Sequence, residues 1–265
     1  MTANVENGGE RPRFASPRHQ ELLELIRVEG RADGSALAER FGVTPETIRR
    51  DLTMLERRGL VRRVHGGAIP VHRLGYEPTL EQRLRTLPEE KARIAHAAID
   101  ELPNGGSIAL DAGSTVGGMV VLLPSELELI VVTHAHPLAG VLAAMSNIAL
   151  HLVGGAVRTK TMAAIGPWAQ RAYAEVHVDV AFLGVNGITV ENGISTPDIE
   201  EASVKRAIID HAQRVVVLAD HTKLGRDEFG IVAGIDRVDV IITDSNADPT
   251  LVSEFETAGV EVVLA

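Results

Sequence analysis

Apolar residues recur at helical spacing in three short stretches near the start of the chain. The repeats predict helices over residues 18–29 and 35–41 and from Pro45 onward, each with one apolar face. These faces consist of Leu22, Leu25 and Ile26 in the first helix, Leu37, Ala38 and Phe41 in the second, and Ile48, Leu52 and Leu55 in the third. A short turn separates the last two. This order is that of a helix-turn-helix, whose final helix is the recognition element.

The third helix has the best-defined start. Thr44 can cap it through its hydroxyl, and Pro45 suits the first helical position, where no amide donor is needed. We expect Ser35 to cap the second helix in the same way. Polar and positive side chains fall opposite the apolar face of the third helix, with Arg50 at their centre. This polar face and its flanks consist of Glu46, Thr47, Arg49, Arg50, Thr53 and Arg57.

A β wing is predicted after the third helix. Residues 60–64 (LVRRV) have a strand pattern, and His65-Gly66-Gly67 reads as a turn. Arg62 and Arg63 on this wing can reach DNA phosphates beside the groove, and His65 is a further candidate contact. A trihelical unit can also serve packing or protein–protein contacts, but the positive face favours DNA as the partner.

From residue 89 to the end of the chain, strand and helix patterns alternate. Strands are predicted over residues 107–111, 127–133, 148–154, 178–185, 214–220, 239–244 and 260–265. Helices are predicted over residues 89–101, 117–123, 137–145, 167–175, 200–211 and 249–258. Continuous β-branched runs separated by helices indicate an α/β domain with a buried, mostly parallel, Rossmann-like sheet covered on both faces. The expected division is a disordered tail (1–16), a winged helix-turn-helix (17–72), a linker rich in proline (73–88) and the α/β domain (89–265).

Charge separates the two parts of the chain. Residues 1–75 hold 13 of the 26 Lys and Arg and 10 of the 36 Asp and Glu, a net +3; the remainder, with 13 against 26, carries −13. All 13 cations of the first part are arginine, which suits bidentate contacts with phosphate and guanine, although codon usage can also enrich arginine.

Composition narrows the function further. The chain has no cysteine, which excludes disulfides and thiol catalysis. The most apolar region, 130–157, is interrupted by histidine, proline and asparagine, so no membrane span is expected. The first eighteen residues lack an apolar run of signal-peptide length, and we expect a cytoplasmic protein.

Polar residues and glycines cluster where the predicted strands end, which is where open α/β sheets bind ligands. The candidates are Asp111, Gly113, Ser114, Thr115, Thr133, His134, Gly155, Arg158, Asn186, Asp220 and Lys223. Residues 111–115 (DAGST) open a helix, so their free amides and hydroxyls could hold a phosphate. An ordinary strand-to-helix turn would have the same composition. The cations at 158 and 223 favour an anionic ligand.

Glu201 and Lys205 lie four residues apart on one predicted helix, the favourable order for an ion pair. They could form a solvated surface pair, hold sugar hydroxyls, or carry out acid–base isomerisation of a sugar phosphate. The histidines are scattered, so the sequence gives little support to a metal site, and no cofactor is expected.

Two sets of motifs resemble the DeoR family of bacterial transcriptional regulators. The first is TIRRDLTMLERRGLVRRVHGGA (47–68), and the second comprises DAGST, GGAVR, FLGVNGI, STPDIEEASVK, LADHTKLG and ITD. The resemblance implies a winged helix-turn-helix followed by an α/β domain similar to ribose-5-phosphate isomerase, which senses phosphorylated sugars without converting them. Thr44 stands where the family commonly has Ser, and His134 where it commonly has Asn.

The resemblance also assigns ligand positions. It implies a phosphate loop at Gly113, Ser114 and Thr115, supported by Asp111. It implies a sugar-binding side made of Thr133, Gly155, Arg158, Asn186, Glu201, Lys205, Asp220 and Lys223.

The leading hypothesis is therefore a regulator, expected to repress a sugar-metabolism operon, whose affinity for operator DNA depends on a phosphorylated sugar or sugar alcohol. Helix-turn-helix proteins commonly pair to read two half-sites, so a homodimer or homotetramer is expected. The alternative is a sugar-phosphate isomerase or deaminase with an accessory N-terminal domain.

Overall fold

The computed structural model describes residues 17–28, 32–64, 66–70 and 77–265. The chain forms two compact units, residues 1–73 and 74–265, and each is described here by itself. The predicted tail (1–16) and His65 lie outside the described residues.

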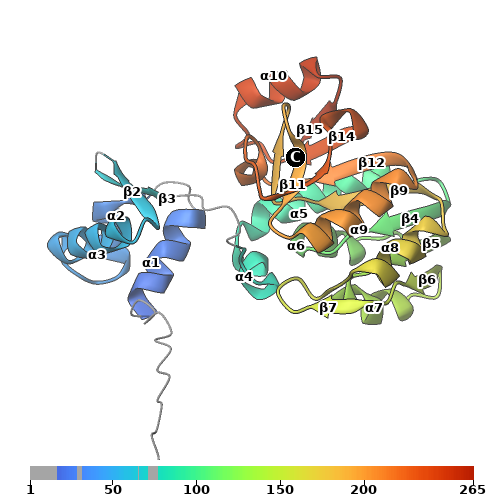
Figure 1. Ribbon diagram of the computed structural model, residues 1–265, viewed down its shortest axis with the longest axis horizontal. Coiled ribbons are helices and arrows are strands. Elements are labelled where there is room, and N and C mark those ends of the chain that lie inside the picture. Colours follow the sequence, from blue (N-terminus) through green and yellow to red (C-terminus); the bar gives the residue numbers. More distant parts are fainter. Residues whose placement is uncertain (1–16, 29–31, 65, 71–76) are drawn as a thin grey trace, which may run out of the picture. The chain divides into compact units, whose positions relative to one another are not determined.

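The first unit is a winged helix-turn-helix, as predicted. Its elements are α1 (Pro17–Val28), β1 (Ala32–Asp33), α2 (Gly34–Arg40), α3 (Pro45–Arg57), β2 (Val61–Val64) and β3 (Gly67–Pro70) (Figure 1). The three strands form an antiparallel sheet in the order β1-β3-β2. Leu22 from α1, Leu37 from α2 and Leu52 from α3 meet in one buried core, so the predicted apolar faces converge.

Strand β1 and the start of α2 differ from the prediction. Strand β1 was not predicted, because a strand of two residues has no measurable period in the sequence. Asp33, not Ser35, is the N-cap of α2: its carboxylate accepts hydrogen bonds from the backbone amides of Ser35 and Ala36. The Ser35 hydroxyl also donates to this carboxylate. The carboxylate satisfies two amides at once, which explains why it takes the capping position.

The second unit is built on a parallel sheet of seven strands, which confirms the predicted α/β class. The strands are β4 (Gly106–Leu110), β5 (Leu129–Thr133), β6 (Ile148–Leu152), β9 (Val178–Gly184), β12 (Ala212–Leu218), β14 (Val240–Thr243) and β15 (Glu261–Leu264). Their order across the sheet is β15-β14-β12-β9-β4-β5-β6. All seven correspond to strands predicted from the sequence.

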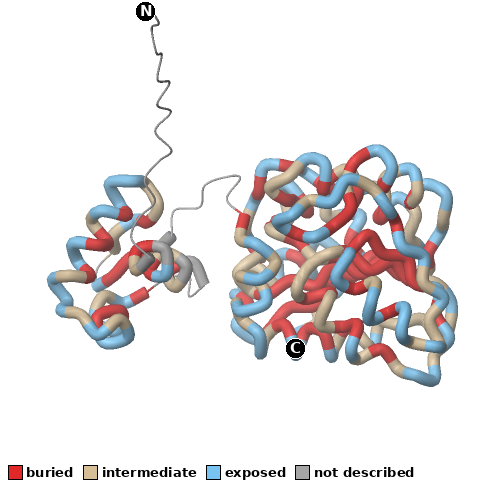
Figure 2. Tube along the Cα trace, turned by 90° about the horizontal axis from the view of Figure 1, so that it is seen from below, coloured by how far each residue is buried: buried red, intermediate tan, exposed pale blue. Residues whose placement is uncertain are grey.

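Helices cover both faces of this sheet and form two separate cores. One face carries α5 (Pro88–Ala97), α6 (Ser114–Val120) and α7 (His136–Ala143), and the other carries α8 (Pro167–Ala174), α9 (Ile199–Asp210) and α10 (Pro249–Thr257). Phe182 belongs to the first core and its neighbour Leu183 to the second, as the alternation of side chains along a strand requires. Figure 2 shows the buried residues concentrated along the strands of this unit.

Several short elements were not predicted. They are α4 (Leu80–Arg85), the hairpin of β7 (Ala156–Arg158) and β8 (Ala163–Ile165), the small sheet of β10 (Gly187–Thr189), β11 (Gly193–Thr196) and β13 (Gly230–Ala233), and the 3-10 turns η2 (His221–Lys223) and η3 (Ile235–Arg237). Each is too short to produce a clear period in the sequence. The 3-10 turn η1 (Ala98–Glu101) follows α5 and lies within the helix predicted over residues 89–101.

The predicted linker (73–88) is wrong in its second half. Thr79 and Gln82 form a capping box at the start of α4, and the amide of Leu80 donates to the carbonyl of Lys160 at 2.8 Å. Glu77 is buried. Residues 77–88 therefore belong to the second unit instead of bridging the two units.

The strand order reverses between β4 and β9. From β4 the chain continues to β5 and β6 on one side, and then to β9, β12, β14 and β15 on the other. The carboxyl ends of the two strands at such a reversal are the usual ligand site of an open α/β sheet. Asp111 follows β4 at this point, and its amide donates to Phe182 of β9 at 3.0 Å.

Candidate functional site

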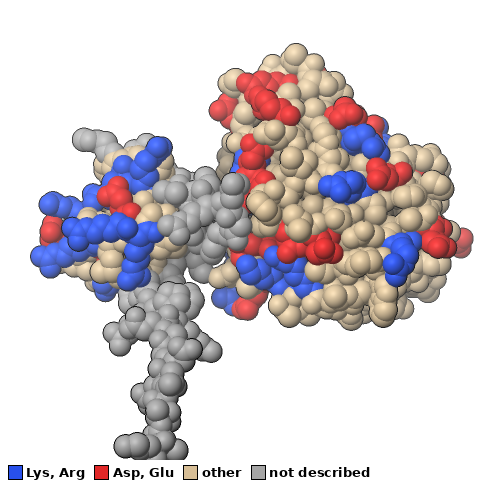
Figure 3. Space-filling view, in the orientation of Figure 1, with Lys and Arg blue, Asp and Glu red and all other residues tan. Residues whose placement is uncertain are grey.

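The recognition helix α3 presents the predicted positive face. The hydroxyl of Thr44 accepts a hydrogen bond from the amide of Thr47 at 3.2 Å, and Pro45 is the first helical residue. The side chains of Arg49 and Arg50 are 69% and 80% exposed, and each lies within 3.6 Å of the Glu46 carboxylate. These exposed pairs are weakly held, so both arginines can turn toward DNA. In Figure 3, Lys and Arg gather over this unit.

The wing is tied to the recognition helix. The amide of Arg63 donates to Glu56 at 2.8 Å, and its guanidinium donates to the Thr53 hydroxyl at 3.1 Å. Thr53 in turn donates to the carbonyl of Arg49 at 2.8 Å. Thr53 and Arg63 therefore hold the wing against the recognition helix, and their contact with DNA stays a prediction. Arg62 and Arg57 are exposed, as predicted for phosphate contacts.

A buried carboxylate joins α1 to α3. Asp51 accepts a hydrogen bond from Arg18 at 2.9 Å and lies 2.7 Å from a ring nitrogen of His19. Burial raises the pKa of Asp51, but the bonds to His19 and Arg18 outweigh it and the pKa is lowered. The sequence analysis overlooked Asp51, although its position three residues after Ile48 places it on the buried side of the helix.

In the second unit, Asp111 stands at the reversal of the sheet and is fully buried. Its carboxylate accepts from the amide of Gly184 at 2.9 Å and from the ammonium of Lys205 on α9. The expected ion pair between Glu201 and Lys205 is therefore wrong among the described contacts. Spacing along a helix shows only local neighbours, and Asp111 lies 94 residues away in sequence.

His134 packs behind this carboxylate. Its Nε2 lies 3.4 Å from Asp111, and its Nδ1 lies 2.9 Å from the hydroxyl of Tyr173. Burial lowers the pKa of His134 to about 4, with Asp111 opposing the shift and Lys205 adding to it. The ring is thus neutral at physiological pH, and it adds no charge beside Asp111.

Glu201 lies among hydroxyls and one arginine. It accepts hydrogen bonds from Thr161 and, at 3.4 Å, from Arg158. Thr196 connects it to Asn186, since the Thr196 hydroxyl lies 3.5 Å from Glu201 and 3.1 Å from the Asn186 amide oxygen. Burial raises the pKa of Glu201, although Lys205, Thr161 and Arg158 lower it.

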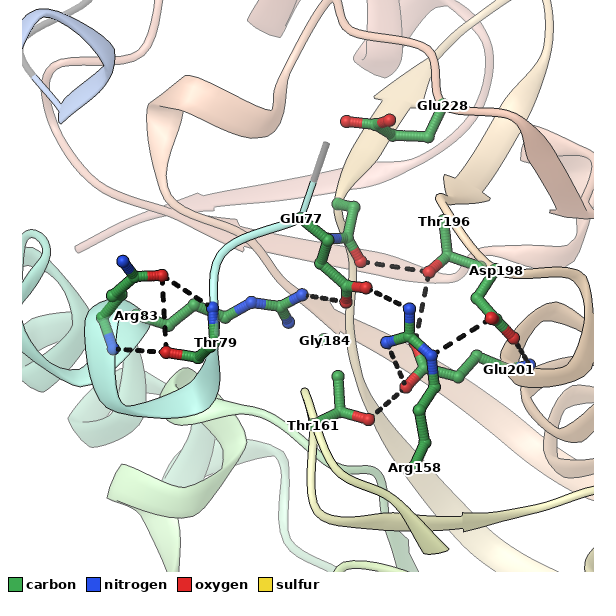
Figure 4. Close-up of polar contacts among 12 residues, drawn as sticks. Glu77, Thr79, Arg83, Arg158, Thr161, Gly184, Thr196, Asp198, Glu201 and Glu228 are labelled. Atoms are coloured by element: carbon green, nitrogen blue, oxygen red, sulfur yellow. Dashed lines mark hydrogen bonds and ion pairs between the residues drawn. The ribbon is translucent and has the colours of Figure 1, made fainter. Parts of the chain in front are cut away.

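Arg158 contacts three carboxylates. Its guanidinium lies 2.5 Å from Glu77, 3.1 Å from Asp198 and 3.4 Å from Glu201. Burial acts against the charge of Arg158, but the hydrogen bond to Glu77 and the three carboxylates raise its pKa. Glu77 also contacts Arg83 of α4. Figure 4 shows Glu77 between the two arginines.

Further cations lie near Asp220. Lys223 lies 3.8 Å from Asp220, and burial lowers its pKa while Asp220 raises it. Burial lowers the pKa of Lys91 to about 8, again against the charge of Asp220, and its ammonium donates to two backbone carbonyls at 2.6 Å. Arg226 and Glu228 form an ion pair at 2.6 Å that acts on Lys223.

These interactions define one continuous charged cluster. It consists of Glu77, Arg83, Lys91, Asp111, Arg158, Asp198, Glu201, Lys205, Asp220, Lys223, Arg226 and Glu228. The predicted loop at residues 113–115 follows Asp111 of this cluster in sequence: Gly113 is the N-cap of α6, and Ser114 and Thr115 are its first residues. The sequence analysis missed Glu77, Arg83, Lys91, Asp198, Arg226 and Glu228, because they come from elements that it did not predict or from positions away from the main strand ends.

Thr133 and Gly155, both predicted to bind ligand, make contacts within the fold that stabilise the local backbone. The hydroxyl of Thr133 donates to the carbonyl of Leu110 at 2.6 Å and accepts from the amide of Ala135 at 3.1 Å. A side chain at Gly155 would begin 2.7 Å from the carbonyl of Ile165, so glycine permits the β7–β8 hairpin to close. Both positions shape the surroundings of the charged cluster.

Comparison with protein families accounts for both units. Residues 18–73 match the DeoR-like helix-turn-helix domain, and residues 87–245 match the DeoR C terminal sensor domain. The chain belongs to the DeoR family.

Two relatives that are named as transcriptional regulators align with this DeoR-family chain over nearly their whole length. The HTH-type transcriptional regulator GlpR of Haloferax volcanii is 37% identical over 246 residues, which cover 93% of this chain and 96% of that protein. The glycerol-3-phosphate regulon repressor of Escherichia coli K12 is 32% identical over 228 residues, which cover 86% of this chain and 90% of that protein. The DeoR-family chain is thus a DNA-binding transcriptional regulator, and the alternative of an isomerase or deaminase is not favoured.

Solved structures give weaker likenesses. The ribose 5-phosphate isomerase A of Methanocaldococcus jannaschii matches with a TM-score of 0.39 and 18% identity, covering 51% of this chain and 54% of that one. The full-length sorbitol operon regulator SorC of Klebsiella pneumoniae matches with a TM-score of 0.40 and 15% identity, covering 89% and 98%. Scores of this size carry no weight for function.

No group of three or more His, Asp or Glu side chains in the described ranges is placed to hold a metal ion. No helix within those same ranges is long and apolar enough to cross a membrane.

Proposed function

We propose that this DeoR-family regulator represses an operon of sugar metabolism and that a phosphorylated sugar or sugar alcohol controls its affinity for operator DNA. The charged cluster carries the proposal. Lys205 contacts Asp111, which follows β4, and Lys223 follows β12 of the same parallel sheet. Arg158 contacts Glu201 on the helix that carries Lys205, and the loop at residues 113–115 opens α6 two residues after Asp111. Cations and free amides at this position suit a phosphate.

The repressor assignment is supported by the relatives. The glycerol-3-phosphate regulon repressor of Escherichia coli K12 is named for a phosphorylated sugar alcohol, and a protein of Escherichia coli O157:H7 that is 29% identical is named a putative aga operon transcriptional repressor. We infer that ligand binding lowers the affinity of the recognition helix for operator DNA. Coupling of about 1–3 kcal/mol would change DNA affinity roughly 5- to 150-fold.

For DNA reading, Arg50 is the central residue of the proposal. We expect Arg50→Ala to weaken binding to a specific operator by about 1–3 kcal/mol, or roughly fivefold to 150-fold, because a bidentate arginine–base contact has this value. The operator is first selected from random-sequence DNA with the unmodified protein, and binding is then measured by fluorescence anisotropy.

A matched control is available for this test. Arg85 is 78% exposed and pairs with Glu81 four residues earlier, as Arg50 pairs with Glu46. Arg85→Ala thus removes the same charge from the same local geometry, and it should leave operator affinity unchanged. Equal affinities of the two variants would refute the groove assignment.

The effector class is tested with the unmodified protein. Phosphorylated sugars and sugar alcohols are screened by thermal shift beside their unphosphorylated forms, with and without operator DNA. A phosphorylated compound should stabilise the protein and release the operator, and its unphosphorylated partner should do neither. Release by an unphosphorylated sugar would contradict a phosphate site.

We also propose that the protein acts as a homodimer or homotetramer. Two recognition helices would then read two half-sites about one helical turn of DNA apart, near 34–36 Å. Sedimentation with and without the selected operator would determine the number of chains per operator, and a single chain per operator would contradict this proposal.

A further inference from the structure

Glu77 places a carboxylate between two arginine side chains. The Glu77 side chain is 0% exposed, whereas the side chains of Arg83 and Arg158 remain 17% and 16% exposed. Figure 4 shows the carboxylate between the two guanidinium groups. An anion in the solvent can therefore approach Arg83 and Arg158, whose guanidinium groups contact the buried carboxylate of Glu77.

The three carboxylates around Arg158 are not held equally. Asp198 caps α9 by accepting from the amides of Glu200 and Glu201, and Glu201 itself lies in that helix. Glu77 lies outside any helix or strand, two residues before the cap of α4. Of the three, Glu77 can leave Arg158 with the smallest change in the fold.

Guanidinium groups bind phosphate and carboxylate through the same forked geometry. The Arg83–Arg158 pair is thus chemically a site for an anionic group, and Glu77 supplies that group from the protein itself. Removing Glu77 changes the charge of the five groups Glu77, Arg83, Arg158, Asp198 and Glu201 from −1 to zero. A ligand anion would restore the original balance.

We propose that Arg83 and Arg158 form a second anion site, which Glu77 fills until an effector displaces it. The inference rests on the proposed function and divides its charged cluster in two: one phosphate binds at residues 113–115 and Lys223, and the second anionic group binds at Arg83 and Arg158. The effector then carries two anionic groups, as a sugar bisphosphate or a phosphorylated sugar acid does. Glu77 is the fourth residue after Arg73, the end of the first unit, so the residue that is displaced lies close in sequence to the DNA-binding unit.

The test compares full-length protein with its Glu77→Gln variant by titration calorimetry. The probes are 6-phosphogluconate, glucose 1,6-bisphosphate and glucose 6-phosphate; the first and last differ in the carboxylate at one end. Loss of the internal competitor should raise affinity for the two doubly anionic probes by about tenfold or more, the value of a charge-assisted hydrogen bond. Affinity for glucose 6-phosphate should change less than about twofold by the same reasoning.

Glu81→Gln is the matched control, since Glu81 is 76% exposed and pairs with Arg85 on the same short helix. It should bind all three probes like the unmodified protein. An equal gain for the singly and doubly anionic probes overturns the second anion site, and so does the failure of Glu77→Gln to bind any probe more tightly.

Hydrogen exchange of the unmodified protein gives an answer even if Glu77→Gln does not fold. With 6-phosphogluconate or glucose 1,6-bisphosphate bound, the peptide covering residues 77–85 should exchange faster, because it loses its anchor on Arg158. Slower or unchanged exchange in the presence of both ligands overturns the inference.

The inference and the proposed function fail in distinguishable ways. If Glu77→Gln gains no affinity while a phosphorylated sugar still releases the operator, the second anion site is wrong and the proposed function stands. If no phosphorylated compound changes operator binding, the proposed function itself is wrong.

Discussion

The neutral state of buried His134 makes the stability of the sensor unit depend on pH. Burial lowers the pKa of this ring from 6.5 to about 4. As pH falls below 6.5, His134 takes up a proton in the unfolded chain but stays neutral in the folded chain until the pH nears 4. Protons thus favour the unfolded chain, and stability present above the unfolded pKa is lost as pH falls toward the folded pKa.

The size of this loss follows from the two pKa values. Each pH unit between them removes about 1.4 kcal/mol, so about 3 kcal/mol disappears between pH 6.5 and 4. For a unit of this size that corresponds to roughly 6–12 °C in melting temperature. Asp220 and Asp244 have lowered pKa values, and their contribution is lost only as pH falls below the range of an unfolded Asp, near 3.9.

The assay is urea unfolding followed by circular dichroism at pH 7.5, 6.5, 5.5 and 4.5. His134→Gln replaces the ring with an amide that does not titrate, so its stability should vary much less with pH over this range. Glu201, whose pKa is raised, works in the opposite direction but is common to both proteins, so the difference isolates His134.

His136→Gln is the matched control, because His136 lies two residues along the chain and is exposed. It should keep the full pH dependence of the unmodified protein. If His134→Gln retains the same slope, then the folded chain protonates His134 as readily as the unfolded chain does, and our account of the pocket around Asp111 is wrong.

Two further substitutions test the charged cluster. Lys205→Met should destabilise the sensor unit by about 3–5 kcal/mol in urea unfolding, because it leaves the buried carboxylate of Asp111 without its cation. A loss below about 1 kcal/mol would contradict a buried ion pair. Lys223→Ala should weaken calorimetric binding of a phosphorylated effector about tenfold, the value of one charged hydrogen bond, and leave operator affinity without ligand unchanged. Undiminished effector affinity would remove Lys223 from the site.

Much of the fold was predictable because its long elements have strong periods. The helices that bury Leu22, Leu37 and Leu52 and the seven strands of the parallel sheet all follow from the spacing of apolar residues. The short elements were not predictable in this way. Helix α4 has six residues, less than two turns, and the prolines around it favoured a linker.

The candidate site was predictable in its residues but only partly in its contacts. Asp111, Arg158, Glu201, Lys205 and Lys223 were identified because strand ends and helix faces are visible in sequence. Their partners come from distant parts of the chain, and local spacing therefore misassigned one of them: Lys205 contacts Asp111 and not Glu201.

The charges of the cluster limit how it can bind an anion. Six cations, Arg83, Lys91, Arg158, Lys205, Lys223 and Arg226, stand against six anions, Glu77, Asp111, Asp198, Glu201, Asp220 and Glu228. The cluster has no excess positive charge to offer, and the rest of its unit is acidic. Two changes would create such an excess for a phosphate: a carboxylate takes up a proton, or a carboxylate moves away.

Glu201 and Glu77 represent these two routes. Burial raises the pKa of Glu201, which makes it ready to take up a proton, but a ligand that relied on this route would bind much more tightly in acid. Displacement of Glu77 needs no proton, so it works at any pH at which the ligand is charged. It also moves a residue close in sequence to the DNA-binding unit, whereas protonation of Glu201 changes only the interior of the sensor. Of the two, only displacement of Glu77 both makes room for an anion and moves a residue that lies four positions after the end of the first unit.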